Sequence, residues 1–222
     1  MKKLIRGIID FQHNVLPKRR EIFAKLALGQ SPDTLFIACS DSRVAPNWFA
    51  STDPGDLFVI RNVGNLVAPS GRNGHSAADE SEGAAIEFAI ANLGVKDIII
   101  CGHSECGAMQ ALINGREKVQ TPNLKAWLRH GEIALSKLND MSDFAPNLPR
   151  HNRLSQLNVV QQIENIKSYP IVKEKLAIGE IRIHGWWFEL SNAAVHIYDT
   201  GKKKFVRIDD KEANHLLQGM DE

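Results

Sequence analysis

Three short apolar runs predict buried strands in the first half of the chain. They are residues 35–38 (LFIA), 57–60 (LFVI) and 98–101 (IIIC), each bounded by Pro, Gly or Asp. Unbroken apolar runs of this length are typical of parallel strands that are covered on both faces. Residues 83–93 combine good helix formers with an apolar face, and Gly94 is placed to end that helix. The order strand, helix, strand predicts a right-handed crossover and an α/β fold.

The N-terminal stretch predicts an amphipathic helical arm over residues 3–28. Its apolar positions recur at helical spacing and are Leu4, Ile5, Ile8, Phe11, Ile22, Phe23 and Leu26. Pro17 is expected to split the arm into two helices, and Gly29 is expected to end it. Such an arm must bury its apolar face against its own sheet or against a neighbouring molecule.

The second half of the chain predicts further helices and a final pair of strands. The expected helices are residues 124–138 and 154–166, and the expected strands are residues 181–187 and 194–198. Two polar stretches, residues 69–79 and 140–153, are interpreted as surface loops, and the basic run at 202–204 as a solvated turn.

Composition narrows the class of protein. The 222 residues are 43% hydrophobic and 24% charged, which is close to the globular average and excludes disordered, collagenous and coiled-coil classes. Lys and Arg number 27 against 26 Asp and Glu, so no basic excess points to nucleic acid. Apolar runs stay short of the roughly 18–20 residues that a membrane-spanning helix needs, and we expect no membrane partner.

The N-terminus and the cysteines both point to the cytoplasm. Lys2 and Lys3 resemble the start of a signal peptide, but Arg6 and Asp10 interrupt the apolar region, so we expect a mature N-terminus. Three cysteines are an odd number, and a chain of this length does not need disulfides to fold. A reducing, cytoplasmic location is therefore expected.

Two polar segments follow predicted strands and carry the candidate chemistry. Residues 39–43 (CSDSR) follow the first strand, and residues 101–107 (CGHSECG) follow the third. The carboxyl ends of parallel strands line the ligand-binding edge of an open α/β sheet, so both segments can converge there. Cys39, His103 and Cys106 then form a three-ligand set.

Two thiolates and one imidazole suit Zn²⁺, and three protein ligands leave a fourth position open, which indicates catalysis. Cys101 ends the Ile run and is expected to be a buried packing residue. A Cys106–His103 nucleophile pair is an alternative, but it leaves Cys39 and the Asp41–Arg43 pair without roles. The chain contains no phosphate loop, dinucleotide fingerprint, Cys-x-x-Cys or Gly-x-Ser-x-Gly motif.

Asp41 and Arg43 are close enough in sequence to pair with each other beside the metal. A carboxylate held by a guanidinium keeps a depressed pKa and a fixed orientation. In that position Asp41 can accept a hydrogen bond from metal-bound water, whereas an exposed loop ion pair would contribute little. We therefore expect both residues to be catalytic.

The residues resemble the β-class carbonic anhydrases, zinc lyases that interconvert carbon dioxide and bicarbonate. The resemblance rests on CSDSR at 39–43 and HSECG at 103–107, with PGDLFVIRN at 54–62 and HGW at 184–186 in the family's order, and extends from the arm to about residue 207. It implies one zinc per subunit on Cys39, His103 and Cys106, with Asp41 binding zinc only in a possible closed state. It also implies attack of zinc-bound hydroxide on carbon dioxide, with Asp41 and Arg43 beside the fourth ligand.

The resemblance further implies a substrate pocket of the plant-like type. Gln30, Phe58, Val63, Phe88 and Gly107 are its expected substrate-binding residues, although plant-like members commonly have Tyr at the position of Phe88. The loop at 70–79 is about four residues longer than the plant-like pattern, and its His75 is expected to be exposed rather than a proton relay.

Other members of the family carry a second bicarbonate site, which the resemblance does not imply for this chain. Members with that site have Trp, Gly and Tyr at the positions where this sequence has Phe36, Ala38 and Phe188. We therefore expect no second bicarbonate site. His184, on a predicted strand, is expected to make a structural hydrogen bond.

The family also implies an architecture and an assembly. We expect one domain over residues 1–222, with an arm at 1–29, a zinc-binding core at 34–207 and a tail at 208–222. The core sheet is expected to have four parallel strands and one antiparallel edge strand, flanked by helices. Dimers or tetramers with arms wrapped around the partner are expected, with the substrate cleft at the dimer interface.

Two other functions remain open. One is hydrolysis of a carbon dioxide analogue such as carbonyl sulfide or carbon disulfide. The other is a non-catalytic, zinc-stabilised interaction protein, although a structural zinc site normally closes its fourth position with a protein ligand.

Overall fold

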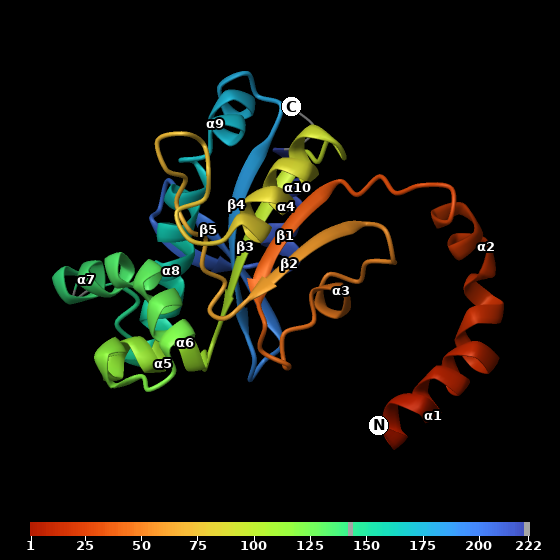
Figure 1. The fold of residues 1–222 in the computed structure, drawn as a ribbon, viewed down its shortest axis with the longest axis horizontal. Helices are drawn as coiled ribbons and strands as arrows, with labels where there is room; N and C mark the ends of the chain where they lie inside the picture. Colours follow the sequence, from red (N-terminus) through yellow and green to blue (C-terminus); the bar gives the residue numbers. More distant parts are fainter. Residues whose placement is uncertain (142–143, 220–222) are drawn as a thin grey trace.

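A six-stranded sheet forms the centre of the computed structural model, which describes residues 1–141 and 144–219 (Figure 1). The strands are β1 (Thr34–Cys39), β2 (Leu57–Asn62), β3 (Asp97–His103), β4 (Arg182–Glu189), β5 (Ala194–Asp199) and β6 (Lys204–Arg207). Their order is β2-β1-β3-β4-β5-β6. The pairs among β2, β1, β3 and β4 are parallel, and β5 and β6 are added antiparallel.

Helices connect the strands and surround the sheet. The α-helices are α1 (Lys2–Asp10), α2 (Leu16–Leu26), α3 (Pro46–Phe49), α4 (Glu80–Ala91), α5 (Gly107–Asn114), α6 (Pro122–Trp127), α7 (Glu132–Asp140), α8 (Arg150–Ile166), α9 (Pro170–Ala177) and α10 (Asp210–Gln218). A π-helical turn, η1 (Phe11–Val15), joins α1 to α2, and the 3₁₀ turns are η2 (Arg116–Lys118) and η3 (Leu128–Gly131).

The predicted α/β fold, its three early strands and its final strand pair are confirmed, and the sheet differs from the prediction in two places. The sequence predicts one antiparallel edge strand, but the structure has two. The second, β6, begins at Lys204 and pairs with β5. The second predicted strand, β2, is not buried on both faces. It lies at the edge of the sheet, and Val59 in its middle is 38% exposed.

Two helix predictions also need correction. The stretch 124–138 is not one helix, because the 3₁₀ turn η3 separates α6 from α7. Pro17 does not separate two independent helices either. It lies in the first turn of α2, where its missing N–H is tolerated, and the chain runs continuously from α1 through the wider turn η1.

Apolar side chains cover both faces of the sheet. On one face, residues of α4, α8 and α9 pack against alternate strand residues such as Leu35 and Ile98. On the other face, Phe36 and Cys101 pack in a cluster that includes Phe49 at the end of α3. Cys101 is fully buried, as predicted, and burial raises the pKa of its thiol.

Helix α8 packs closely against the sheet because the facing strands carry glycine. A Cβ atom on Gly102 of β3 would lie 2.7 Å from Cγ2 of Val159, and a Cβ on Gly185 of β4 would lie 2.9 Å from Cγ1 of the same residue. Side chains at these two positions would therefore push α8 away from the sheet.

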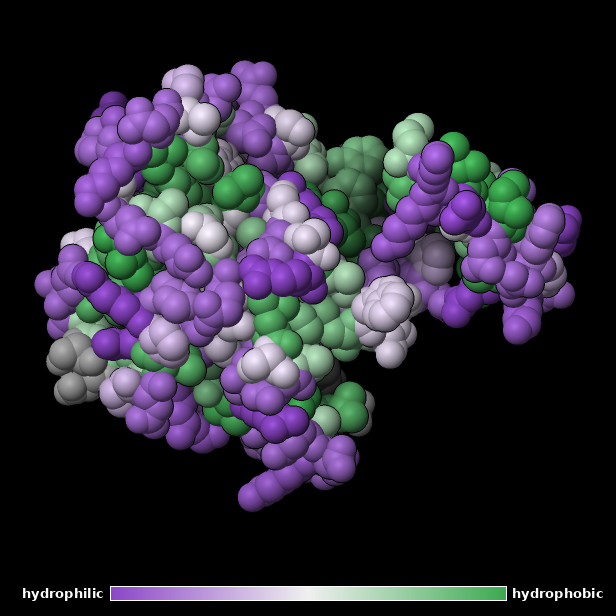
Figure 2. All heavy atoms as spheres, turned by 90° about the horizontal axis from the view of Figure 1, so that it is seen from below, coloured by the Kyte–Doolittle hydropathy of each residue, from purple (hydrophilic) through white to green (hydrophobic). Residues whose placement is uncertain are grey.

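The N-terminal arm stands away from the rest of the molecule (Figures 1 and 2). Helix α1 has no buried residue, and Ile5 and Ile8 on its apolar face are 55% and 57% exposed. An ion pair between Arg19 and Asp53 links α2 to the loop before β2. Within residues 1–141 and 144–219, no helix has both the length and the apolar character to cross a membrane.

We predict that Gly185→Ala lowers the free energy of unfolding by about 1–3 kcal/mol, because the added methyl group overpacks the contact with α8. Its Cβ would also lie 3.0 Å from Cδ1 of Ile163. Urea unfolding followed by circular dichroism measures the change. Gly7→Ala on the exposed face of α1 is the control, since nothing lies within 4 Å of its Cβ. Equal stability of Gly185→Ala and the parent would contradict the close packing of α8.

Candidate metal centre

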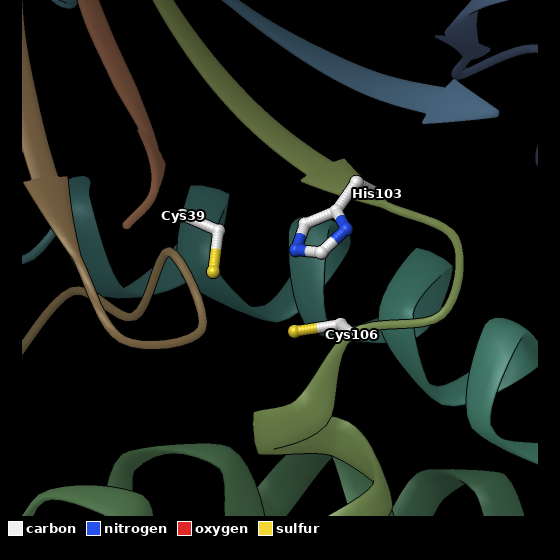
Figure 3. A group of neighbouring side chains, drawn as sticks. All are labelled: Cys39, His103 and Cys106. Carbon is white, nitrogen blue, oxygen red and sulfur yellow. The ribbon is translucent and has the colours of Figure 1, made fainter. Parts of the chain in front are cut away.

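Three segments bring Cys39, His103 and Cys106 together at one edge of the sheet. Cys39 and His103 are the last residues of the adjacent parallel strands β1 and β3, and Cys106 immediately precedes α5. Their candidate ligand atoms all lie within 4.8 Å of one another, and all three residues are buried. Figure 3 shows both sulfur atoms and one ring nitrogen pointing toward a common space. The group has the geometry of a metal site.

The histidine is held in the tautomer that a metal ligand requires. Nδ1 of His103 lies 2.8 Å from the carbonyl oxygen of Ser104, so Nδ1 carries the proton and donates it. The lone pair of the ring is then on Nε2. This atom is buried and has no hydrogen-bond partner among the described residues. A buried nitrogen without a partner is costly, and a metal ion between the two thiols would satisfy it.

The two thiols also fit a metal that binds thiolates. The neighbouring Cys106 thiol lowers the pKa of Cys39 against the opposing effect of burial. The backbone N–H of Gly64 donates to Sγ of Cys39, at 3.3 Å. The same contact between the two thiols raises the pKa of Cys106. The surroundings therefore favour negative charge on at least one sulfur atom before any cation binds.

Asp41 and Arg43 form the pair that the sequence predicts, directly beside the three ligand candidates. Arg43 donates from Nε to Oδ1 of Asp41 at 2.9 Å and from Nη2 to Oδ2 at 2.7 Å. These bonds hold the pKa of Asp41 well below its usual range. Oδ2 of Asp41 lies 3.9 Å from Nε2 of His103. Asp41 is therefore an ionised hydrogen-bond acceptor at the edge of the metal group.

Arg61 is a site residue that the sequence reasoning missed. From β2 its guanidinium donates to the carbonyl oxygen of Cys39, at 3.0 Å from Nε and 2.7 Å from Nη2, and to that of Asp41 at 2.7 Å. These bonds fix the turn that follows β1. Arg61 lies within the 54–62 motif, but a motif alone does not show which carbonyl groups an arginine contacts.

A small cleft of about 310 Å³ opens onto the metal group. It is lined by Cys39, Ser40, Asp41, Val63, Gly107, Ala108, Ala111 and Leu124. Two of the predicted pocket residues, Val63 and Gly107, are among them. Apart from Ser40 and Asp41, the lining of this cleft is mostly apolar.

The other three predicted pocket residues lie outside this cleft. Phe58 and Phe88 contact each other, with ring centroids 5.9 Å apart, and Phe88 is 43% exposed. Gln30 borders a hollow between the end of the arm and Gly55. A single chain does not bring these residues to the metal group.

The remaining sequence predictions can be located as well. Phe36, Ala38 and Phe188 all pack in the apolar cluster on the α3 side of the sheet. His184 makes the predicted structural contact, with Nε2 2.8 Å from Oδ1 of Asp97. His75 is exposed in the 70–79 loop.

Comparison with known proteins identifies the family. The family model described as carbonic anhydrase matches residues 34–195. The solved structure of the β-carbonic anhydrase CcaA superposes with a TM-score of 0.85 and 36% identity, over 95% of this chain and 92% of that one. The chain belongs to the β-carbonic anhydrase family.

Relatives within the family extend over nearly the whole chain. A carbonic anhydrase of Pseudomonas aeruginosa is 38% identical over 208 residues, which cover 94% of this chain and 92% of the relative. A tetrameric β-carbonic anhydrase of Sordaria macrospora superposes with a TM-score of 0.74 and 29% identity, over 88% of this chain and 95% of that one. The chain that carries this sheet and this Cys-His-Cys group is thus related over most of its length to carbonic anhydrases.

We predict that the purified β-carbonic anhydrase chain binds one zinc or cobalt ion per subunit through this group. Cobalt bound to thiolate should give an intense charge-transfer absorption. Cys39→Ser or Cys106→Ser should weaken this absorption, because only one thiolate ligand remains, and should weaken metal binding by more than the roughly 10–100-fold typical of a lost outer hydrogen-bond partner.

Cys101→Ala is the matched control for this prediction, because Cys101 is a buried cysteine outside the group. It should keep both the absorption and the metal content. A spectrum that depends on Cys101 as strongly as on Cys39 would contradict the assignment.

Proposed function

We propose that this protein catalyses the zinc-dependent, reversible hydration of carbon dioxide to bicarbonate and a proton. The observation that carries the proposal is the ionised Asp41 carboxylate beside the buried Cys39, His103 and Cys106 group, at the mouth of an apolar cleft. Membership of the β-carbonic anhydrase family supports the same reaction.

The donor set is suited to catalysis by zinc. When bound through three protein ligands, a zinc ion lowers the pKa of a water molecule at its open position to about 7, which makes water a nucleophile near neutral pH. An ionised Asp41 has no proton to donate, so it accepts a hydrogen bond from the attacking water. This bond orients the water so that a lone pair on its oxygen points toward the substrate. Arg43 keeps Asp41 ionised and fixed in orientation through its two parallel bonds.

The cleft fits a small, weakly polar gas. Carbon dioxide has no charge and needs little room, and Val63, Ala108, Ala111 and Leu124 give the cleft an apolar wall. We assign Val63 and Gly107 to substrate binding from this chain. Because Gln30, Phe58 and Phe88 lie outside the cleft, we assign them to substrate binding through a second subunit.

A homodimer, alone or paired into a tetramer, is the assembly we propose. The apolar face of α1 is uncovered in one chain, and Val59, Val63 and Phe88 near the edge of the sheet are exposed as well. The tetrameric relative from Sordaria macrospora supports association between copies. We also retain the cytoplasm as the proposed location, from the cysteine usage alone.

We predict that Asp41→Asn retains the metal and lowers turnover by about 10²-fold or more, because a neutral amide accepts the hydrogen bond of the attacking water less strongly and loses one of the two bonds from Arg43, so the water is oriented less precisely. Stopped-flow carbon dioxide hydration and metal analysis measure the two effects. Asp97→Asn is the matched control, since Asp97 also pairs with an arginine, Arg182, but at the amino end of β3.

If the Asp41→Asn variant keeps the turnover of the parent protein, Asp41 does not have the proposed role. Assays with carbonyl sulfide and carbon disulfide separate hydration from hydrolysis of these analogues. Hydrolysis of either compound without carbon dioxide hydration would replace the proposed function. A zinc-loaded protein that is inactive toward all three would indicate a binding protein.

We predict that the double variant Ile5→Glu and Ile8→Glu shifts the protein from dimer to monomer, because burying two carboxylates in an apolar contact is costly. Sedimentation velocity measures the change. Lys3→Glu, on the polar face of α1, is the control. It changes the net charge by the same amount as the double variant and should leave assembly intact. A double variant that remains dimeric at micromolar concentration would show that α1 does not hold the partner.

A further inference from the structure

Helix α8 carries a row of buried polar side chains on the face that lies against the sheet and the site. Asn152, Ser155, Asn158, Gln162 and Asn165 are spaced three or four residues apart and are between 0% and 8% exposed. Residues at this spacing share one face of a helix. A buried amide or hydroxyl is costly unless it is hydrogen-bonded.

Asn152 holds the residue between two of the ligand candidates. Its Oδ1 accepts from the backbone N–H of Glu105 at 2.7 Å, and its Nδ2 donates to the Glu105 carboxylate at 3.0 Å. Glu105 has φ +56°, a left-handed conformation that is unfavourable for a residue other than glycine. The two bonds stabilise the bend that lets the chain pass from His103 to Cys106.

Glu105 also connects this bend to Asp41. Its carbonyl oxygen accepts from Nη2 of Arg43 at 3.0 Å, the same nitrogen that contacts the Asp41 carboxylate. Asn152 therefore acts on the orientation of the Asp41–Arg43 pair as well as on the spacing of two ligands.

Ser155, one turn further along α8, holds the strand end at His103. Its Oγ donates to the carbonyl oxygen of His103 at 2.7 Å and accepts from Nε1 of Trp187 at 3.1 Å. Both hydrogen-bonding roles of the hydroxyl are used. This contact is possible because Gly102 of β3 has no side chain, since a Cβ there would lie 3.1 Å from Oγ of Ser155.

Asn158, the next residue of the row, reaches the third ligand through Gly64. Its Nδ2 donates to the carbonyl oxygen of Gly64 at 3.1 Å, and its Oδ1 accepts from Nε2 of Gln162 at 2.8 Å. Gly64 has φ +85°, which a residue with a Cβ rarely adopts, and its N–H is the donor to Sγ of Cys39. Holding the Gly64 carbonyl restrains the backbone of this residue and thereby the direction of the N–H that donates to the sulfur atom.

We propose that Asn152, Ser155 and Asn158 of α8 are positioning residues, which set the relative placement of Cys39, His103 and Cys106 and thereby the affinity and electronic character of the metal centre. The inference rests on the proposed function, since it assumes that this group holds the metal. Three consecutive turns of one rigid helix contact the backbone beside all three ligands, and outer hydrogen bonds of this kind orient ligands and tune a bound metal.

The experiment replaces each of the three residues by alanine and loads the purified full chain with Co²⁺. We expect metal affinity, measured by competition with a chromophoric chelator, to fall by about 10–100-fold in each variant. For Asn158→Ala we also expect the thiolate-to-cobalt absorption to shift, because the Gly64 backbone, whose N–H donates to the sulfur of Cys39, is no longer held in place.

Gln161→Ala is the matched control. Gln161 is also a buried amide on α8, at 6% exposed, but its side chain bonds to Lys137 and Asn165, and none of its hydrogen bonds within the described residues reaches a segment that bears a ligand. The urea midpoint of each metal-free variant reports general loss of stability. If the three residues position the ligands, their variants should lose more metal affinity and change the cobalt spectrum more than Gln161→Ala does. This difference should remain when variants of similar metal-free stability are compared.

Unchanged affinity and spectrum in all three variants would overturn the inference, and so would losses no greater than those of Gln161→Ala. These readouts need bound cobalt and not turnover. A parent protein that binds cobalt but does not hydrate carbon dioxide when loaded with zinc would overturn the proposed function, while the positioning test would still give its own result.

Discussion

The parallel pairing of β1 with β3 is the constraint on which the site depends. Because the two strands run in the same direction and in register, with Ala38 opposite Cys101, they end at the same edge of the sheet. Cys39 and His103 are the terminal residues of these strands, so backbone hydrogen bonding alone brings them close. The sharp bend at Glu105 then turns the chain back and adds Cys106. The metal group is thus a consequence of sheet topology combined with one strained turn.

The sequence was most informative where local chemistry is unusual for its position. Cysteine, histidine and an Asp–Arg pair are poor choices for packing at strand ends, so their residue types alone suggested a site, and the structure brings them together. It was least informative about neighbours in space. The apolar run of β2 predicts burial of both of its faces, but the run does not show that this strand lies at the edge of the sheet. Strand β6 has only four residues, which is too short for a clear alternating pattern.

The polar face of α8 was missed for a different physical reason. Asn, Ser and Gln at helical spacing resemble the solvated side of an ordinary amphipathic helix, and nothing local shows that these side chains are buried. Their partners are backbone groups far away in sequence, such as Gly64 for Asn158. A backbone carbonyl has no residue-type signature, so only the folded chain reveals these contacts. The glycines at 102 and 185, which admit the helix, would have been the available signal.

The proposed assembly and the proposed catalysis both depend on the apolar surface beside the cleft. Val63 lines the cleft and is 43% exposed, so the wall of the substrate pocket continues directly into uncovered apolar surface. A second copy seated on that surface would bury it and exclude water from the cleft in the same step. Exclusion of bulk water strengthens the Asp41–Arg43 interaction, because charges attract more strongly where the dielectric constant is low. Helix α1, which has no buried residue in a single chain, would then couple association of the two copies to completion of the site.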